Sequence, residues 1–492
     1  MSRNQNQSKM DKIVSLAKRR GYIFQSSEIY GGLSSCYDYG PLGVELRKNI
    51  KEIWWNDIVT SRENVVGMDS SILMHPKVWE ASGHVENFTD PLVDCKQCKN
   101  RFRLDKGVHK FKCTNCRMKF HVKDGKIGGR KKYRECFDDL TASEPESYVN
   151  STCPRCGEEE SIFLDKIACP KCGAADLTEP KQFNLMFKTH YGASEDSAHK
   201  IYLRPETAQG IFVNYANVAN SARAKLPFGI AQIGKAFRNE VTTRNFIFRS
   251  REFEQMELEF FVRPQESQEW HEKWIEARLD WYKKIGIKEE NLQLREHGDD
   301  ELAHYAKACV DVEYKFPFGW SELEGIADRQ TYDLQQHIDH SGTKLTYYDQ
   351  DKQEHIVPAV VESSAGVDRT MLTVLSDAYW EDEENDRVVL SLSPKIAPIK
   401  AAVFPLVNRE GMPDLAREIF MNLQGNIPVE YDDGGSIGRR YRRQDEAGTP
   451  FCITVDSQSL EDDTVTLRDR DSLEQIRIAK DELLKEIKNR IE

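Results

Sequence analysis

Apolar residues recur at helical spacing in two internal segments of the chain. Leu46 and Ile50 share one helical face with Ile53 and Trp54, so this pattern predicts a helix over residues 41–59. A second amphipathic pattern predicts a helix over residues 270–285. Near the end of the chain, Ser472 and Gln475 have the spacing of a capping box. Apolar residues then recur at Leu473, Ile476, Leu483 and Ile487, which predicts a last helix from residue 472.

Other segments have the pattern of strands. A strand-like run extends over residues 65–76, and residues 201–203 lead into a helix-compatible stretch that ends at Ala219. Residues 228–262 predict two strands joined by a loop. From Ser393 onward the pattern changes to short strands alternating with helices, and the strands are expected at residues 401–407, 451–455 and 464–467. The acidic run at 381–387 indicates a loop or a domain boundary.

Alternation along the predicted hairpin separates two kinds of side chain. Successive strand residues point to opposite faces of a sheet. One face carries Phe253, Gln255, Glu257 and Glu259, and the other carries Glu254, Met256, Leu258 and Phe260. The same rule places Arg238 and Glu240 together at the end of the preceding strand. A face with this many polar groups is expected to line a site, since a solvated face does not explain Phe253 and the apolar residues around it.

One apparent phosphate-binding motif is better explained as a strand. Residues 229–236 nearly match the P-loop pattern G-x4-G-K-[ST], but Ala236 occupies the place of the Mg²⁺-binding hydroxyl. The residues between Gly229 and Gly234 have strand character, whereas the phosphate cradle needs a flexible loop.

Composition limits the classes of function that remain. The chain has 492 residues, 39% hydrophobic and 30% charged, which allows roughly three folded domains. No apolar stretch has the length of a membrane span, and the polar start MSRNQNQSKM does not resemble a secretory signal, so a cytoplasmic protein with no membrane partner is expected. The net charge of −12 requires any nucleic-acid binding to use local basic patches.

Eight of the twelve cysteines form four C-x2-C pairs. The sequence order groups Cys95 and Cys98 with Cys113 and Cys116, and it groups Cys153 and Cys156 with Cys169 and Cys172. Both spacings suit a zinc ribbon in which four thiolates bind one tetrahedral Zn²⁺. Two structural zinc sites are therefore expected, and the alternatives are a redox dithiol or a ribbon that only staples a short insertion. Cys36, Cys136, Cys309 and Cys452 lack such partners and are interpreted as ordinary thiols.

Charge is unevenly distributed around these cysteines. Residues 96–134 are rich in Lys and Arg and contain only Asp105 and Asp124 as acids, whereas residues 135–165 are acidic. Aromatic residues lie within the basic segment at Phe102, Phe111, Phe120 and Tyr133. This segment fits a phosphate-binding surface and a solvated face without a partner equally well.

Two segments of the predicted hairpin resemble the second signature motif of class II aminoacyl-tRNA synthetases. They are FRNE at 237–240 and RSREF at 249–253. GVDR at 366–369 resembles the third motif, and the helix and strand that end at Pro76 resemble the first, which builds the dimer interface in that class. The class I signatures HIGH and KMSKS are absent from the sequence.

Longer motifs narrow the resemblance to the homodimeric type of glycyl-tRNA synthetase and cover nearly all of the chain. They are YGPLG at Tyr39, WEASGHVENFTDP at Trp79, LRPETAQGIF at Leu203, WSELEGIADR at Trp320 and GGSIGRRYRRQDEAGTPFCITVD at Gly434. The family usually has Glu-Pro-Ser before the third motif, whereas this chain has Glu362-Ser363-Ser364. Losing the proline removes backbone rigidity and should leave the flanking side chains in place. The cysteine insertion is also richer than in many bacterial members.

The resemblance implies that ATP, bound with Mg²⁺, activates glycine for transfer to tRNA(Gly). The substrate carboxylate attacks the α-phosphorus, so positioning and charge stabilisation do most of the catalysis. The catalytic residues implied are Arg238 at the α-phosphate, Glu240, and Arg369 at the γ-phosphate, while Phe253 stacks on adenine. The ATP-binding positions implied are Arg238, Asn239, Glu240, Phe248, Arg249, Ser250, Arg251, Glu252, Phe253, Glu322, Leu323, Gly366, Val367, Asp368 and Arg369.

Glycine recognition is implied to rest on carboxylates for the ammonium group and on steric exclusion of larger side chains, with no editing domain. The main contacts are Glu206, Glu257, Glu362 and Ser364, with Arg103 as a basic contact. The whole glycine set implied is Arg103, Glu206, Phe253, Glu254, Gln255, Met256, Glu257, Glu362, Ser363, Ser364, Ala365 and Gly366.

The expected architecture is α+β. A class II antiparallel-sheet domain covers 10–90 and 181–392, a two-ribbon zinc insertion covers 91–180, and a mixed α/β anticodon-binding domain covers 393–492, in a homodimer. Two alternatives are a catalytically inactive synthetase-like nucleic-acid-binding protein and a ligase that forms an adenylate without tRNA. The complete set Arg238, Glu240, Phe253 and Arg369 argues against the first, and the likeness of the C-terminal domain to an anticodon reader argues against the second.

Overall fold

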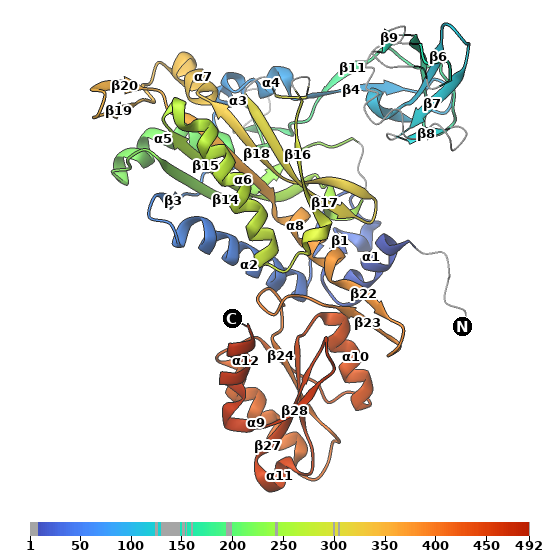
Figure 1. The fold of residues 1–492 in the computed structure, drawn as a ribbon, viewed down its shortest axis with the longest axis vertical. Coiled ribbons are helices and arrows are strands. Elements are labelled where there is room, and N and C mark those ends of the chain that lie inside the picture. Colours follow the sequence, from blue (N-terminus) through green and yellow to red (C-terminus); the bar gives the residue numbers. More distant parts are fainter. Residues whose placement is uncertain are drawn as a thin grey trace. The chain divides into compact units, whose positions relative to one another are not determined.

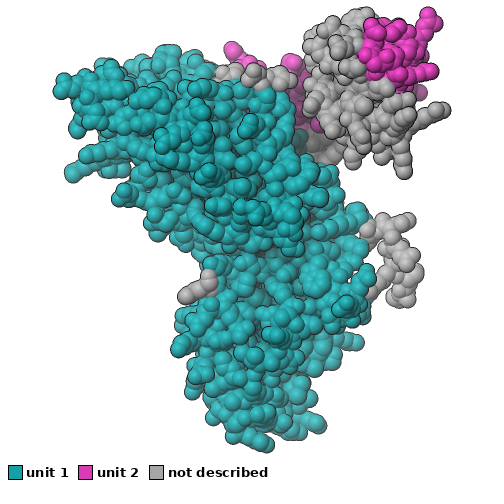
Figure 2. All heavy atoms as spheres, viewed as in Figure 1, with its two compact units in different colours: residues 1–82, 188–237, 243–492 teal, residues 83–187, 238–242 magenta. Residues whose placement is uncertain are grey.

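The chain forms two compact units. The computed structural model describes residues 8–123, 126–128, 148–149, 153, 155–158, 161–192, 199–241, 245–298, 301–303 and 306–491. The first unit comprises residues 1–82, 188–237 and 243–492, and the second comprises residues 83–187 and 238–242 (Figure 2).

The first unit is built on a seven-stranded sheet with the order β16-β17-β18-β21-β15-β14-β3 (Figure 1). All neighbouring pairs are antiparallel except β14 and β3. The strands are β3 (Val65–Gly67), β14 (Phe228–Phe237), β15 (Glu252–Val262), β16 (Leu292–Glu296), β17 (Ala308–Phe316), β18 (Gly319–Gln330) and β21 (Ala359–Gly366).

Helices cover the two faces of this sheet unequally. On one face the apolar residues of β15, β18 and β21 form the main core with helices α2, α6 and α8. On the other face, α5 and α7 pack over one end of the sheet, around Phe228, Phe261 and Val360. The polar positions of β15 and β21 lie on this second face. The helices are α1 (Lys9–Arg19), α2 (Pro41–Trp55), α3 (Pro76–Ala81), α5 (Ala208–Ser221), α6 (Ser267–Lys284), α7 (Tyr332–Ser341) and α8 (Val367–Ala378).

Four two-stranded sheets complete this part of the first unit. They are β1 (Ile23–Gln25) with β2 (Tyr37–Tyr39), β12 (Lys188–Tyr191) with β13 (His199–Tyr202), β19 (Tyr347–Asp349) with β20 (Glu354–Ile356), and β22 (Tyr379–Asp382) with β23 (Arg387–Leu390).

The C-terminal part of the first unit is a mixed sheet with the order β25-β24-β26-β27-β28. Strand β24 pairs in parallel with its two neighbours β25 and β26, and the remaining pairs are antiparallel. Buried contacts join it to the preceding residues, because the Tyr22 hydroxyl donates to the Ala447 carbonyl oxygen at 2.8 Å and Arg387 Nη1 lies 3.3 Å from Asp445 Oδ2. The elements are β24 (Ala401–Pro405), α9 (Met412–Gln424), β25 (Val429–Tyr431), α10 (Ile437–Ala447), β26 (Phe451–Val455), α11 (Ser459–Asp462), β27 (Thr464–Asp469), β28 (Gln475–Ala479) and α12 (Leu483–Ile491).

The second unit contains two small sheets, with the orders β11-β4-β5 and β8-β7-β6-β10-β9. Two small clusters of buried side chains form its core, and both contain cysteines. The elements are α4 (His84–Asn87), β4 (Thr89–Asp94), β5 (Arg101–Arg103), β6 (Val108–Cys113), β7 (Lys119–Lys123), β8 (Lys126–Gly128), β9 (Tyr148–Val149), β10 (Ile162–Ala168) and β11 (Lys181–Asn184).

Most of the elements predicted from the sequence are confirmed. The hairpin appears as β14 and β15, residues 229–236 are a strand, and the helix expected at 41–59 is α2 followed by a π-helical turn at Asn56–Thr60. The acidic run is the turn of the β22–β23 hairpin, where Arg387 Nε donates to Asp382 Oδ2 at 2.6 Å. Among the described residues, no helix is both long and apolar enough to cross a membrane.

Two predicted elements are wrong. The strand expected at 65–76 ends at Gly67, because Ser70 turns toward Arg204 and Gln232, and Leu73 makes only an isolated bridge to Leu203. The helix expected from 472 begins only at Leu483. Residues 475–479 instead form β28, which pairs with β27, and the Ser472 hydroxyl accepts a hydrogen bond from the Glu474 backbone within a turn.

Candidate active site

The open part of the sheet carries a row of polar side chains from three adjacent strands. In the strand register Gln232 of β14 lies opposite Glu257 of β15, and Glu257 lies opposite Ser364 of β21. Glu259 lies opposite Glu362 in the same ladder. Residues that oppose one another point to the same face, so the predicted alternation is confirmed and these five side chains form one polar surface.

Glu257 is the most heavily hydrogen-bonded residue of this surface. Its Oε1 accepts from Ser364 Oγ and Gln255 Nε2, both at 2.8 Å. Its Oε2 accepts from the Thr207 backbone N–H at 3.0 Å and from the Thr207 hydroxyl. Thr207 precedes the first residue of α5, so its N–H needs an acceptor outside the helix. These bonds hold the Glu257 carboxylate in one orientation.

Arg329 joins two further carboxylates on the same side of the sheet. Its Nε and Nη2 donate to both Asp333 oxygens at 2.7 and 2.8 Å, and its Nη1 lies 3.1 Å from each Glu362 oxygen. Arg329 lies near the end of β18 and Asp333 lies in the first turn of α7, so the pair also fixes the strand-to-helix connection. The bidentate pair with Asp333 and the shared contact of Nη1 with both Glu362 oxygens orient the two acids.

Burial, together with an excess of acids over bases, raises the pKa of two carboxyl groups in this cluster. Burial raises the pKa of Glu362 to about 7, with Arg329 opposing the shift and Glu257 and Glu206 adding to it. Burial and the neighbouring charge of Glu362 raise the pKa of Glu259 well above its usual value. A positively charged ligand would favour the ionised form of both groups.

Several buried polar atoms on this face have no hydrogen-bond partner among the described residues. They are Gln232 Nε2, Gln255 Oε1 and both carboxylate oxygens of Glu259. Ser70 Oγ donates to Gln232 Oε1, and Gln255 Nε2 donates to Glu257. These bonds identify the oxygen and the nitrogen of each side-chain amide. The surface therefore offers one free donor beside free acceptors, and buried groups of this kind usually have partners.

The first turn of α5 borders the same surface. Gln209 Nε2 donates to Glu206 Oε1 and to Asp333 Oδ1, both at 3.1 Å, which connects Glu206 to the Arg329 cluster. Beneath it Arg204 crosses Gly234, where an added Cβ would lie 2.4 Å from Arg204 Nη2. Only glycine permits this approach, because a Cβ would displace the guanidinium.

Two residues of the segment that resembles the third motif, Arg369 and Asp368, have different roles. Arg369 lies in the first turn of α8, where its Nη1 is 3.0 Å from Glu322 Oε1 and its guanidinium carbon is 4.7 Å from the Phe248 ring centroid. Asp368 is buried and accepts from the Glu254 backbone N–H at 2.9 Å, with Arg47 of α2 at 3.4 Å. Arg369 is thus directed toward residues of the predicted ATP set, whereas Asp368 connects elements of the core.

Several residues of the predicted set have side chains on the opposite face or in the core. Glu254 pairs with Arg47 and Lys51 of α2. Ser363 donates to Glu324 on the side of α6. Only the backbone groups of these residues face the polar surface. The remaining members of this group, all buried in the main core, are Met256, Leu323, Ala365 and Val367.

The loop between β14 and β15, together with the first residue of β15, holds four further predicted residues. Arg251 donates to the Ser34 carbonyl oxygen at 3.0 Å, and Glu252 pairs with Lys235. Ser250 is buried and its hydroxyl has no partner among the described residues. Arg249 follows the turn Phe246–Phe248, while Phe253 lies opposite Ala236 and Gly366 lies opposite Gln255.

The second unit contains the other predicted ligand-binding residues. The Arg238 guanidinium lies 5.4 Å from the Phe88 ring centroid, and the Asn239 N–H donates to the Leu185 carbonyl oxygen at 2.7 Å. Glu240 is buried in this unit. Arg103 Nη1 lies 3.1 Å from Asp90 Oδ1, and its Nε donates to Asp105 at 2.9 Å.

The cysteines of the second unit form two clusters, but the grouping predicted from the sequence order is wrong. One cluster is Cys95, Cys98, Cys169 and Cys172, and the other is Cys113, Cys116, Cys153 and Cys156. Antiparallel pairing of β6 with β10 is the reason, because it brings the inner pairs together at one end and the outer pairs at the other. Bonds across each end confirm this, from Thr114 N–H to Ser161 O at 2.8 Å and from Lys96 N–H to Asp176 O at 3.0 Å. Cys136 lies outside the described residues.

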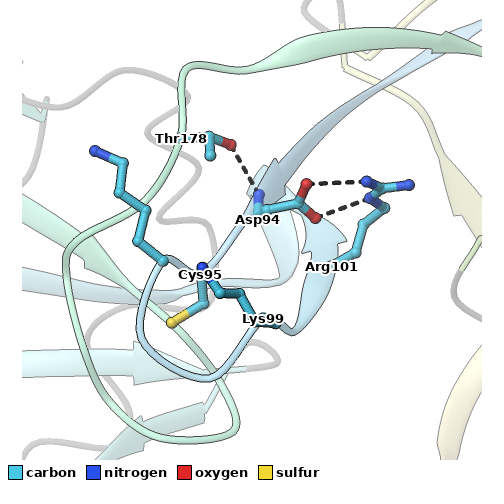
Figure 3. Close-up of a pocket in the computed structure, with 6 residues that line it drawn as sticks. Asp94, Cys95, Lys99, Arg101 and Thr178 are labelled. Atoms are coloured by element: carbon cyan, nitrogen blue, oxygen red, sulfur yellow. Dashed lines mark hydrogen bonds and ion pairs between the residues drawn. The ribbon is translucent and has the colours of Figure 1, made fainter.

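A shallow pocket lies beside the outer cysteine cluster (Figure 3). It is lined by Asp94, Cys95, Lys96, Lys99, Arg101 and Thr178. Figure 3 shows Arg101 bound to both oxygens of Asp94, at 2.8 and 2.9 Å. Lys96 also pairs with Asp176, and Lys112 pairs with Asp165. Much of the described positive charge is therefore compensated locally, which favours the solvated-face interpretation there; residues 129–134 of the basic segment lie outside the described residues.

Sequence reasoning missed four residues that organise the polar face. Arg329, Asp333, Thr207 and Gln209 hold the predicted acids in place but were assigned no role. Arg329 and Asp333 have an i, i+4 spacing, Thr207 directly follows Glu206 and Gln209 lies three residues after it, so the quoted motifs contain all of them except Asp333. Their contacts depend on strand register, which spacing does not give.

Comparison with known proteins agrees with this arrangement. A family model described as "tRNA synthetase class II core domain (G, H, P, S and T)" matches residues 187–378, and one described as "Anticodon binding domain" matches residues 400–490. The chain is 51% identical over 484 residues to glycine–tRNA ligase from Caldanaerobacter subterraneus subsp. tengcongensis, covering 98% of each chain. It is 50% identical over 490 residues to glycine–tRNA ligase from Treponema denticola, covering 98% of this chain and 97% of the relative. The chain therefore belongs to the glycine–tRNA ligase family, with a class II synthetase core and an anticodon-binding domain.

Proposed function

We propose that this protein joins glycine to tRNA(Gly) at the expense of ATP. The reaction has two steps: the glycine carboxylate attacks the α-phosphorus to give glycyl-adenylate and pyrophosphate, and the tRNA 3′-terminal adenosine then accepts the glycyl group through its 3′-hydroxyl. The observation that carries the proposal is the acid-rich polar face of a class II core, which presents unpartnered acceptors beside an unpartnered donor.

Glycine offers an ammonium and a carboxylate and no side chain, and this face suits both groups. Glu257, Glu362 and Glu206 supply negative charge for the ammonium, and Gln255 Oε1 adds a neutral acceptor. Gln232 Nε2 is the free donor for the carboxylate. Arg329 acts as a positioning residue, because its bidentate pair fixes Asp333 and its Nη1 contacts both oxygens of Glu362.

ATP is proposed to bind through arginines and one aromatic ring. Arg369 grips the γ-phosphate and Arg238 grips the α-phosphate, since each guanidinium can donate to two phosphate oxygens. Phe253 stacks on adenine. Glu322 provides carboxylate oxygens of the kind that Mg²⁺ prefers, and bound Mg²⁺ would neutralise charge on the phosphates. Arg369 Nη1 lies 3.0 Å from Glu322 Oε1, so ATP binding must compete with this ion pair.

Two assays test the proposed function. Pyrophosphate exchange into ATP should depend on glycine, and total tRNA should be charged with glycine when each amino acid is offered in turn. Arg238→Lys keeps the charge but loses the bidentate geometry, so adenylate formation should fall by about 2 kcal/mol of transition-state stabilisation. Exchange that is independent of glycine, or charging with another amino acid, would overturn the proposal.

We further propose that each four-cysteine cluster holds one structural Zn²⁺. Two sulfur–sulfur distances in the outer cluster are 3.6 Å and two in the inner cluster are 3.7 Å, and all four sulfurs of each cluster lie within 4.8 Å of one another. A regular tetrahedron with Zn–S bonds of about 2.3 Å has edges of about 3.8 Å, so both clusters fit the ion. Four thiolates leave no position for a substrate, and neither ion is proposed to take part in catalysis.

Paired substitutions test the zinc sites and their nested grouping together. Cys95→Ser with Cys169→Ser damages one cluster, so one of two ions per chain should be lost. Cys95→Ser with Cys113→Ser damages both clusters, and both ions should be lost. The grouping by sequence order predicts the loss of both ions from the first variant and of one ion from the second. Metal analysis of the two proteins therefore distinguishes the groupings. Wild-type protein that contains no zinc, when purified without chelator, would contradict the sites themselves.

The protein is also proposed to act as a homodimer in the cytoplasm. Five large apolar side chains are exposed within the first 73 residues, which include the segment resembling the first motif. They are Ile29, Tyr30, Leu33, Val44 and Leu73, and Ile29 and Tyr30 are each 87% exposed. Exposed apolar side chains gathered in one region are typical of an interface. Tyr30→Glu should shift the mass measured by light scattering from dimer to monomer, whereas an unchanged mass would place the interface elsewhere.

A further inference from the structure

A third group of potential metal ligands lies at the edge of the large sheet, in the first unit. It comprises His297, Cys309 and Asp311, whose ligating atoms all lie within 4.8 Å of one another. His297 follows β16, and Cys309 and Asp311 lie two residues apart on β17. Neither the predicted ATP and glycine residues nor the four C-x2-C pairs include any of them.

The strand register explains why these three side chains meet. Arg295 of β16 lies opposite Asp311, which places His297 beside Cys309, and the His297 N–H donates to the Cys309 carbonyl oxygen at 3.0 Å. Cys309 and Asp311 point to the same face because they are two residues apart on a strand. His297 Nε2 lies 2.8 Å from Asp311 Oδ2. Backbone pairing, rather than a flexible loop, positions the set.

The chemistry of the set favours one class of ion. An imidazole nitrogen, a thiol sulfur and a carboxylate oxygen together suit zinc and similar borderline divalent ions, whereas Mg²⁺ and Ca²⁺ prefer oxygen ligands alone. Asp311 is buried, and the His297 side chain is 21% exposed. The site is therefore open on one side, as expected for three protein ligands and one exchangeable position.

The charged residues around this group are compatible with a bound cation. The nearest base is Arg295, whose Nη1 lies 3.9 Å from Asp311 Oδ2, but its Nη2 lies only 2.5 and 2.7 Å from the two oxygens of Glu301. Glu313 and Glu322 lie opposite each other on the adjoining strands β17 and β18. Arg295 is thus largely neutralised by another partner.

We infer that His297, Cys309 and Asp311 form a third metal site, which binds a divalent ion of the zinc class with one open coordination position. Asp311 lies opposite Gly325, and Gly325 lies opposite Ser364. The site therefore occupies the same face as the proposed glycine residues, two strands away, or about 10 Å. A bound ion would link the end of β16 to β17 and fix the edge of that face.

Titration of the full-length, zinc-loaded protein with Co²⁺ tests this inference. Wild-type protein should take up one ion per chain beyond the two held by the cysteine clusters, without releasing zinc. Its absorption should show a thiolate-to-cobalt charge-transfer band. Cys309→Ser should abolish the band, and His297→Asn and Asp311→Asn should each raise the dissociation constant by at least about tenfold. Cys36→Ser removes another thiol of the same unit and should change neither result.

Two results would overturn the site. One is a wild-type protein that binds no third ion, in which case His297 and Asp311 form a hydrogen bond only. The other is a third ion that persists in both Cys309→Ser and His297→Asn. Because Asp311→Asn preserves the size of the side chain, it supplies a readout if Cys309→Ser fails to fold. The measurement is independent of aminoacylation, so its outcome is separate from that of the proposed function.

Discussion

Two buried arginines on opposite faces of the same sheet have different electrostatic surroundings. Arg278 of α6 donates through Nε to Glu324 Oε1 at 2.7 Å, and both side chains are 0% exposed. Its Nη1 lies 3.9 Å from Asp57, and neither Nη atom has a hydrogen-bond partner among the described residues. On the other face Arg329 pairs with Asp333 and Glu362, while Glu257 and Glu206 add further negative charge.

The different surroundings of the two arginines indicate different roles, one in stability and the other in ligand binding. Glu324 and Arg329 lie five residues apart on β18, so one strand contributes to both faces. The Arg278–Glu324 pair is enclosed by the main core, where the two opposite charges compensate each other. The Arg329 cluster keeps an excess of acid and unpartnered acceptors, which a cationic ligand would complete. Loss of an acid should therefore reduce stability on the first face and ligand affinity on the second.

The largest effect is expected from Glu324→Ala. The substitution leaves the Arg278 guanidinium buried without its carboxylate, which costs about 3–5 kcal/mol. Urea unfolding should show this as a lower midpoint with an unchanged slope. The double variant Arg278→Met with Glu324→Leu removes both charges and should recover most of the loss. An unchanged midpoint in Glu324→Ala would show that the pair contributes little.

A smaller effect, now on binding, is expected from Glu257→Gln. Loss of the charge should weaken the contact with the glycine ammonium by about 1.5–3 kcal/mol, or roughly ten- to hundredfold in KM for glycine. The KM for ATP should change far less. The same substitution on the other face, Glu324→Gln, is the matched control and should lower stability without changing the KM for glycine. A larger effect on ATP than on glycine would contradict the proposed orientation of Glu257.

The pH dependence of glycine binding is expected to be smaller still. Burial raises the pKa of Glu362 to about 7 in the ligand-free protein. The ammonium favours the ionised carboxylate, so below about 7 binding must displace a proton, and the KM for glycine should rise by up to about tenfold per pH unit. Above about 7 the KM should level off while the glycine amine stays charged. Glu362→Gln should remove this step, and a step that persists would assign it to another group.

The sequence predicted the polar face because alternation along one strand is a local property. Phe253, Gln255, Glu257 and Glu259 are two residues apart, so their common direction follows from any extended backbone. Arg329 was missed because its contact with Glu362 depends on β18 lying beside β21. No spacing along the chain reveals that Arg329 Nη1 will lie 3.1 Å from Glu362 Oε1.

The wrong grouping of the cysteines and the wrong helix at residue 472 have the same origin. The cysteine pair nearest to Cys95 and Cys98 in the sequence is at 113–116. The antiparallel pairing of β6 with β10 instead brings Cys95 next to Cys169 and Cys172. Ser472 and Gln475 have the local signal of a helix start, yet pairing with β27 makes residues 475–479 a strand. Local patterns predicted elements well where tertiary pairing agreed with them.

The smallest effect on glycine binding is expected from Glu259→Gln, two residues from Glu257 on the same face. Because burial and Glu362 raise the pKa of Glu259 well above 4.5, the folded protein keeps this carboxyl protonated where the unfolded chain has released the proton. A neutral amide of the same size therefore changes little, and the KM for glycine should shift by less than about twofold. The stability difference should instead depend on pH. As pH rises above 4.5, ionisation in the unfolded chain destabilises the wild type, so the variant should gain stability relative to it in urea unfolding. A large rise in the KM for glycine would show that Glu259 is ionised in the complex and binds the ammonium directly, in which case the charge of the polar face would not be confined to Glu206, Glu257 and Glu362.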